Sequence, residues 1–121
     1  MDPRAIATQF VQHYYNTFDS NRANLKTLYM ADSRLSFEGQ EFVGPDAIVS
    51  KLESLPFKAV QHVITTVDSH VSGQSLLVSV LGQLKTDDDP PHSFFQTFVL
   101  VQSGETLVVL NDIFRLVIHN V

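Results

Sequence analysis

Apolar side chains in the first third of the chain follow the period of a helix. Between residues 6 and 18 they recur three and four positions apart, on one helix face: Ile6, Phe10, Val11, Tyr14, Tyr15 and Phe18. Asp2 followed by Pro3 is a typical helix start, because the carboxylate caps a free N–H and proline lacks one. Turn formers at residues 18–21 end this pattern, and Leu25, Leu28 and Tyr29 then predict a second, shorter helix.

A short strand and a third helix are expected next. Residues 33–38 alternate apolar and polar side chains, which is typical of a strand. Gly44-Pro45-Asp46 favours a helix start, and Pro56 closes the helix. Its apolar face carries Ile48, Val49, Leu52 and Leu55.

The remainder predicts four long strands with turns between them. Their approximate ranges are 59–70, 75–86, 92–102 and 106–118. Short connections imply that successive strands pair antiparallel. Helices followed by a run of strands indicate one α+β domain, residues 1–121, whose helices cover one face of the sheet.

Both faces of the last two predicted strands are apolar. Phe94 and Phe98 lie on one face, and Phe95 and Val99 on the other. Because three short helices cover only one face, we expect the second face to meet another copy of this chain across a two-fold axis. The alternative is that helices and a wrapped sheet edge bury both faces within one chain.

Composition and net charge exclude several classes of function. The chain has 121 residues and is 44% hydrophobic, enough for a single core. Its net charge of −5 argues against binding to nucleic acid, which requires a basic face. The absence of cysteine excludes disulfides, thiolate-bound zinc and a thiol nucleophile. The sequence predicts neither a secretory signal nor membrane insertion, so we expect a cytosolic or nuclear domain.

Motifs for cofactor chemistry are not found. Gly39 and Gly44 have the spacing of a phosphate-binding loop, but Pro45-Asp46 follows where lysine and serine or threonine are required. The five histidines do not fall at metal-ligand spacings. We therefore expect no metal and no cofactor.

Two acidic segments are candidates for partner binding. Asp87-Asp88-Asp89 is either a solvated turn closed by two prolines or a charged rim for basic side chains of a partner. Phe37-Glu38-Gly39 ends a predicted strand, and its simplest interpretation is a core phenylalanine beside a surface glutamate.

Two residues on predicted strands are candidates for acid–base chemistry. His62 shares a face with Val60, and a strand histidine is most often satisfied by a neighbouring group. Asp112 shares a face with Phe114, so if buried it must be hydrogen-bonded or protonated. A lone carboxylate in a cavity also suits a proton-shuttling isomerase.

Several segments resemble the nuclear transport factor 2 family, in its order and nearly its spacing, from about residue 10 to the C-terminus. They are His13-Tyr14-Tyr15, Phe18-Asp19, Phe37-Glu38-Gly39-Gln40, Ser54-Leu55-Pro56-Phe57, Gln61-His62, the run from Gly82 to Pro90, and Asn111-Asp112-Ile113-Phe114-Arg115-Leu116. The resemblance implies a cone-like α+β fold in which three N-terminal helices pack on a strongly curved antiparallel β-sheet.

The resemblance also implies a homodimeric carrier without enzymatic activity. Members of the family bind the GDP form of the small GTPase Ran and the phenylalanine-glycine repeats of nucleoporins. They carry Ran from the cytoplasm through the nuclear pore into the nucleus. Ran inserts an aromatic side chain of its second switch region into the cavity of the cone, and its basic residues pair with acids on the rim.

The resemblance assigns the functional positions of the family to individual residues of this sequence. The Ran-binding residues are Phe37 at the cavity mouth, where some members carry tryptophan, with Glu38, His62, Asp87 and Asp89 on the rim. The cavity wall is expected to include Leu55, Val60, Ile113 and Phe114. Members often carry a large aromatic near the start of the first helix, where this chain has Pro3 to Ile6. Nucleoporin binding is therefore expected either to be weaker or to depend on Ile6, Asp19 and the apolar dimer groove.

Two other functions stay open. A small isomerase or dehydratase of the same fold would use Asp112 or His62 as its base. The second alternative is a structural subunit of a messenger-RNA export heterodimer, although such a subunit would not need the rim acids.

Overall fold

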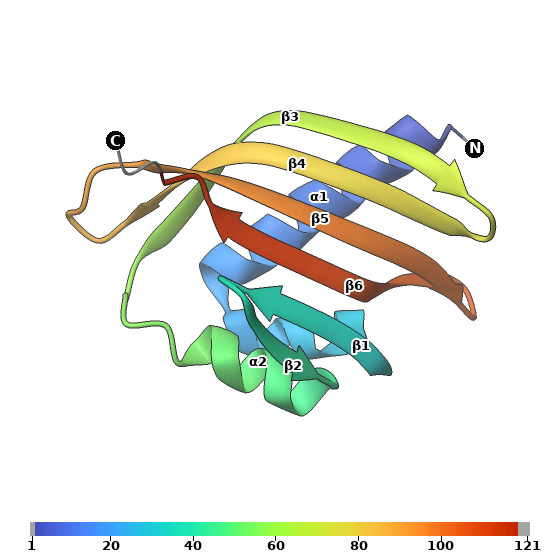
Figure 1. Ribbon diagram of the computed structural model, residues 1–121, viewed down its shortest axis with the longest axis horizontal. Helices are drawn as coiled ribbons and strands as arrows, with labels where there is room; N and C mark the ends of the chain where they lie inside the picture. The colour runs from blue at the N-terminus through green and yellow to red at the C-terminus, as the bar shows by residue number, and fades with distance from the viewer. Residues whose placement is uncertain (1, 119–121) are drawn as a thin grey trace.

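A computed structural model describes residues 2–118. Its elements along the chain are α1 (Pro3–Ser20), the 3₁₀ helix η1 (Arg22–Leu28), β1 (Tyr29–Phe37), β2 (Gln40–Val43), α2 (Pro45–Glu53), β3 (Val60–Ser72), β4 (Ser75–Thr86), β5 (His92–Ser103) and β6 (Thr106–Leu116) (Figure 1). The six strands form one sheet in the order β2-β1-β6-β5-β4-β3.

Most predicted elements are confirmed, and the local signals explain why. Asp2 caps α1, because its Oδ1 accepts a hydrogen bond from the N–H of Arg4 at 3.0 Å. The four long strands lie where they were expected and pair antiparallel in sequence order. The second helix is a 3₁₀ helix, and Tyr29 begins β1 instead of ending that helix. Strand β2 was not predicted, because its four residues are mostly exposed and show no alternation.

The prediction of a wholly antiparallel sheet is wrong at one pair of strands. β1 lies parallel to β6, with Leu35 opposite Asp112 and Phe37 opposite Phe114. Only strands joined by short turns are expected to pair antiparallel, and these two strands are far apart in the sequence. The helices also do not all precede the sheet, since α2 follows β1 and β2.

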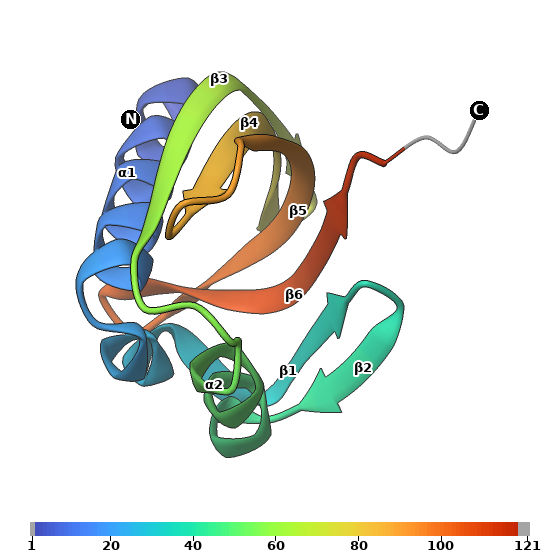
Figure 2. The ribbon, with the colours of Figure 1, turned by 90° about the vertical axis from the view of Figure 1, so that its left-hand side faces the viewer.

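The sheet curls around α1, which packs on its concave face, while η1 and α2 lie beside β1 and β2 (Figure 2). The core between α1 and the sheet is aromatic. The ring of Phe98 lies 5.3 Å from that of Phe10 and 4.9 Å from that of Tyr14. These packed rings fix the position of α1 against the sheet.

Gly82 allows the close approach that this curvature requires. It lies opposite Ile64, next to a shift in the β3–β4 register. A Cβ atom at this position would lie 2.5 Å from the carbonyl oxygen of Val63 and 2.9 Å from the ring of Phe94. Only glycine fits here without displacing the backbone of β3.

The convex face of the sheet carries exposed apolar side chains. Val63, Leu81, Phe95 and Ile113, one from each of the four long strands, are between 39% and 55% exposed. Burial of both faces within one chain, the alternative to a dimer, is therefore wrong for residues 2–118. No helix in this range is long and apolar enough to cross a membrane.

Candidate functional site

A cavity of about 230 Å³ lies between the concave face of the sheet and the helices. Its walls are mainly aromatic and aliphatic, including Phe37, Leu55, Phe57, Val60, Phe114 and Leu116. Polar atoms reach it from Thr86, His62, His92 and Gln96. The site is therefore an apolar pocket with a few polar groups, which is the usual composition of a pocket for an apolar guest.

Four of the five residues expected at the mouth and wall line this cavity: Phe37, Leu55, Val60 and Phe114. The rings of Phe37 and Phe114 stack with their centroids 4.7 Å apart. The placement of Ile113 in the wall is wrong, because its side chain is 49% exposed on the convex face. Consecutive residues of a strand point to opposite faces, so Ile113 and Phe114 cannot both face the cavity.

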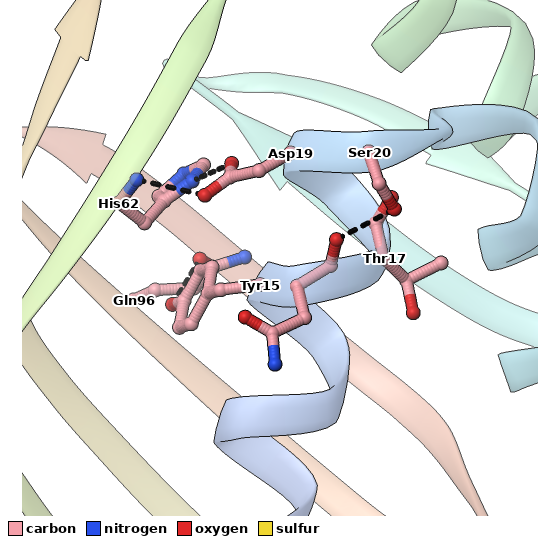
Figure 3. A network of polar contacts seen from close by, with 7 residues as sticks. Tyr15, Thr17, Asp19, Ser20, His62 and Gln96 are labelled. Atoms are coloured by element: carbon pink, nitrogen blue, oxygen red, sulfur yellow. Dashed lines mark hydrogen bonds and ion pairs between the residues drawn. The ribbon is translucent and has the colours of Figure 1, made fainter.

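His62 lies in the cavity wall and is held by Asp19 (Figure 3). Its Nδ1 is 2.6 Å from Oδ1 of Asp19, and its backbone N–H donates to Oδ2 at 2.9 Å. The imidazole is 3% exposed and stacks on Tyr15 with centroids 4.6 Å apart. The expected satisfied histidine is confirmed, and the pair fastens the end of α1 to the edge strand β3.

The two residues expected to bind nucleoporins lie at opposite ends of α1. Thirteen residues of helix separate them by roughly 20 Å. Ile6 lines a surface groove with Val71 and Leu107, whereas both carboxylate oxygens of Asp19 are engaged by His62. The structure does not bring these two residues together.

The rim acids follow directly after residues that line the cavity. Glu38 follows Phe37 in the β1–β2 turn, and Asp87 follows Thr86 in the β4–β5 turn. Both acids have left-handed backbones, with φ of 51° and 48°. The carboxylate of Glu38 accepts a hydrogen bond from the N–H of Leu116. All three aspartates of the second turn are exposed.

Asp112 is buried beneath the cavity, with 1% of its surface exposed. Its Oδ1 accepts a hydrogen bond from Nε2 of Gln96 at 2.7 Å, and its Oδ2 accepts bonds from the hydroxyls of Tyr29 at 2.8 Å and Tyr14 at 3.3 Å. The hydroxyl of Tyr15 donates to Oε1 of Gln96 at 2.6 Å. Every member of this group has a partner, as the sequence required of a buried Asp112.

Burial is the main influence on the pKa values of this network. It raises the pKa of Asp112 to about 6, against the opposing effect of the three hydrogen bonds. Burial also raises the pKa of Tyr14, Tyr15 and Tyr29, so these phenols stay protonated donors. Tyr14 and Gln96 line the cavity while Asp112 does not, which leaves the carboxylate without direct access to a guest.

Gln96 and Phe57 line the cavity but were not predicted from the sequence. Gln96 shares its strand face with Phe94 and Phe98, so strand parity was the signal that could have placed it inward. Phe57 lies in an irregular segment that has no periodicity to read. Within residues 2–118 no three histidine, aspartate or glutamate side chains are placed so that they could hold a metal ion together, and His119 lies outside this range.

Comparisons with known proteins agree on one family. The model of the nuclear transport factor 2 (NTF2) domain matches residues 6–116. Nuclear transport factor 2 of rice, Oryza sativa subsp. japonica, is 50% identical over 96% of this chain and 98% of its own length. The fission yeast protein of the same name is 48% identical over 95% and 96%. The solved structure of nuclear transport factor 2 from Cryptosporidium parvum has a TM-score of 0.90 at 43% identity and covers 93% of each chain.

Solved structures of lower identity share the fold alone. They include a chain of the Candida albicans Mtr2-Mex67 M domain complex, with a TM-score of 0.74 at 16% identity. A putative dehydratase from Streptomyces avermitilis has a TM-score of 0.79 at 14% identity. The same fold therefore occurs in protein complexes and in candidate enzymes, and function must be argued from the site.

Proposed function

The chain belongs to the nuclear transport factor 2 family, and from this premise we propose that it is a homodimeric carrier for GDP-bound Ran. Its relatives are named nuclear transport factors, which assigns it to nucleocytoplasmic transport and protein import into the nucleus. The carrier binds Ran-GDP in the cytoplasm, passes the nuclear pore through contacts with nucleoporin repeats, and delivers Ran to the nucleus. It has no catalytic activity of its own.

The observation that carries this proposal is an apolar cavity whose mouth is flanked by exposed acids. An aromatic side chain of Ran enters the cavity and packs on the stacked rings of Phe37 and Phe114. Basic residues of Ran beside that aromatic pair with Glu38, Asp87 and Asp89. The buried contact provides affinity, and the acids select the partner.

Selectivity for the nucleotide follows from the part of Ran that is bound. The conformation of a GTPase switch depends on the third phosphate, so a protein that binds the switch distinguishes GDP from GTP without touching either. The carrier favours the GDP state only by the difference between its affinities for the two states.

The dimer and the nucleoporin contacts use other surfaces. The exposed apolar residues of the convex face, Leu81, Phe95 and Ile113 among them, pack against a second copy. Phenylalanine-glycine repeats bind through the apolar groove that Ile6 lines, because Asp19 lies at the other end of α1. The carboxylate of Asp19 is also engaged by His62.

Titration calorimetry against Ran loaded with GDP or with GTP tests the proposal. We expect binding to the GDP form alone. Glu38→Lys, and separately Asp87→Asn combined with Asp89→Asn, weaken binding by about 2–5 kcal/mol, because each leaves a basic residue of Ran unpaired. Circular dichroism and light scattering control for fold and dimer. Unchanged affinity in both variants contradicts the assignment of the rim acids.

Two observations favour the carrier over the other functions. Of the two bases expected for an isomerase or dehydratase, Asp112 does not reach the cavity and His62 is held by Asp19 and Tyr15. A purely structural subunit has no use for acids around an apolar pocket. Co-purification with a larger chain in place of self-association would favour such a subunit.

A further inference from the structure

We propose that Asp87 is a positioning residue for the cavity, in addition to being a charge on its rim. Its side chain holds residues 54–59, here called the wall loop, in the place where this loop forms one side of the pocket. The inference deepens the proposed function, because it concerns the same site, but it makes a claim about this chain that can be tested without Ran.

The wall loop connects α2 to β3 and has no regular hydrogen-bonding pattern (Figure 2). It contributes Leu55 and Phe57 to the cavity wall. An irregular segment receives no ladder of backbone hydrogen bonds, so its N–H groups need other partners to fix its position. The position of those partners therefore determines where the side chains of Leu55 and Phe57 lie.

Asp87 supplies partners for two consecutive N–H groups of the wall loop. Its Oδ1 accepts a hydrogen bond from the N–H of Ala59 at 2.9 Å and one from the N–H of Lys58 at 3.2 Å. The N–H of Asp87 itself donates to the carbonyl oxygen of Ala59 at 2.9 Å. Hydrogen bonds to a charged acceptor are stronger than those between neutral groups, so this contact is a firm attachment.

The turn that carries Asp87 is itself held in shape. Asp87 has a left-handed backbone and directly follows Thr86, which pairs with Val60 at the start of β3. Nζ of Lys85 donates to the carbonyl oxygens of Asp87 and Asp89, at 3.1 Å each. The carboxylate of Asp87 therefore extends from a turn whose backbone is held by the hydrogen bonds of Lys85.

Arg22 attaches the wall loop from the other side. Its Nη1 donates to the carbonyl oxygen of Leu52 at 3.0 Å, and its Nη2 donates to that of Phe57 at 3.2 Å. The guanidinium lies 4.8 Å from the centre of the Phe57 ring. The loop is thus attached both to η1, through Phe57, and to the β4–β5 turn, through Lys58 and Ala59.

Asp89 is the matched contrast within the same turn. Its carboxylate makes no hydrogen bond or ion pair with any other group of residues 2–118. It can act on a partner only through its charge, whereas Asp87 has both a charge and a structural attachment. Substitutions at the two positions separate these contributions.

At each of the two positions, the experiment compares a variant that replaces the carboxylate with an amide and a variant that removes the side-chain carboxylate altogether. Asp87→Asn removes the charge but keeps an oxygen acceptor, and asparagine tolerates a left-handed backbone. Asp87→Gly tolerates the same backbone and removes the acceptor, and Asp87→Ser is a second variant whose side chain is too short to span the contact. Asp89→Asn and Asp89→Ala are the controls. For each we measure hydrogen exchange of the Lys58 and Ala59 amides by NMR, and affinity for Ran-GDP by calorimetry.

We expect exchange of both amides to be on the order of tenfold faster in Asp87→Gly and Asp87→Ser than in Asp87→Asn. Neither Asp89 variant changes that exchange. For Ran-GDP, Asp87→Asn and Asp89→Asn weaken binding by similar factors. Asp87→Gly weakens it by roughly a further tenfold, while Asp89→Ala equals Asp89→Asn.

Equal exchange and equal affinity in Asp87→Asn, Asp87→Gly and Asp87→Ser would overturn the positioning role and leave Asp87 as a charge alone. If the wild-type protein does not bind Ran-GDP, the proposed function fails, and the exchange data still decide the positioning role. If the glycine variant does not fold, as judged by circular dichroism, the serine variant provides the same comparison.

Discussion

Asp112 and Ile113 are neighbours on β6 and show the two faces of the sheet in contrast. The polar residue is buried, with 1% of its surface exposed, and the apolar residue is 49% exposed. Asp112 has a donor for each carboxylate oxygen, from α1, β1 and β5. Ile113 shares the convex face with Leu81 and Phe95, which no other element within residues 2–118 covers.

The difference shows that the concave face is buried within one chain, whereas the convex face is exposed. A buried carboxylate is tolerated because its partners come from three separate elements, so the network also fixes their relative positions. An exposed apolar patch across four strands has no such partners and costs solubility unless another surface covers it. Substitutions on the two faces should therefore differ in kind, one affecting folding and the other association.

Ile113→Glu should have the largest effect, and only on association. At a two-fold interface it brings two carboxylates near each other in an apolar contact, which costs several kcal/mol, or roughly a thousandfold in the dimer dissociation constant. Analytical ultracentrifugation over a range of concentrations measures this constant, and circular dichroism should show an unchanged fold.

Val43→Glu is the control for Ile113→Glu. Val43 is 50% exposed but lies at the end of the edge strand β2, so the same charge there should leave the dimer intact. Equal weakening by both substitutions, or a monomeric wild-type protein, would rule out the convex face as the interface.

Asp112→Ala should act on folding. It leaves the amide of Gln96 and one of the two tyrosine hydroxyls without a buried acceptor, because the hydroxyls of Tyr14 and Tyr29 lie 2.7 Å apart and one can donate to the other. We therefore expect the free energy of unfolding to fall by about 3–4 kcal/mol. Asp112→Asn keeps one oxygen acceptor and should cost less than half as much. Denaturant unfolding at fixed protein concentration measures both. Equal losses in the two variants would mean that side-chain volume, not hydrogen bonding, decides stability here.

The pH dependence of unfolding isolates the charge of Asp112. Its folded pKa of about 6 lies above the ordinary value of 3.8, so the folded protein keeps a proton that the unfolded chain has released. The protonated carboxyl of Asp112 therefore contributes fully to the free energy of unfolding below about pH 4. This contribution, roughly 2–3 kcal/mol, is lost as the pH rises through about 6.

The groups facing Asp112 from α1, β1 and β5 do not titrate in this range. They are Tyr14, Tyr29 and the amide of Gln96, and burial raises the pKa of both phenols above 10.0. Asp112→Asn should accordingly remove this part of the pH dependence. A wild-type profile that matches the asparagine variant between pH 4 and 6 would show that burial does not shift the carboxyl.

The sequence predicted part of the site on the regular strands. The family resemblance assigned Val60, Ile113 and Phe114 to the cavity wall, and Val60 and Phe114 line the cavity. Strand parity contradicts Ile113, because consecutive residues of a strand point to opposite faces of the sheet. Phe57 could not be predicted from periodicity, because Arg22 and Asp87, more than 25 positions away on either side, fix it.

The sequence by itself determined the helices, the four long strands and the family. These depend on local period, capping and short motifs, which act over a few neighbouring residues. Only the tertiary structure decided that β1 runs parallel to β6, that Asp112 is enclosed by Tyr14, Tyr29 and Gln96, and that Asp87 holds the wall loop. Each of these contacts joins segments far apart in the chain. Their geometry exists only after the sheet has curled around α1 and the core has packed.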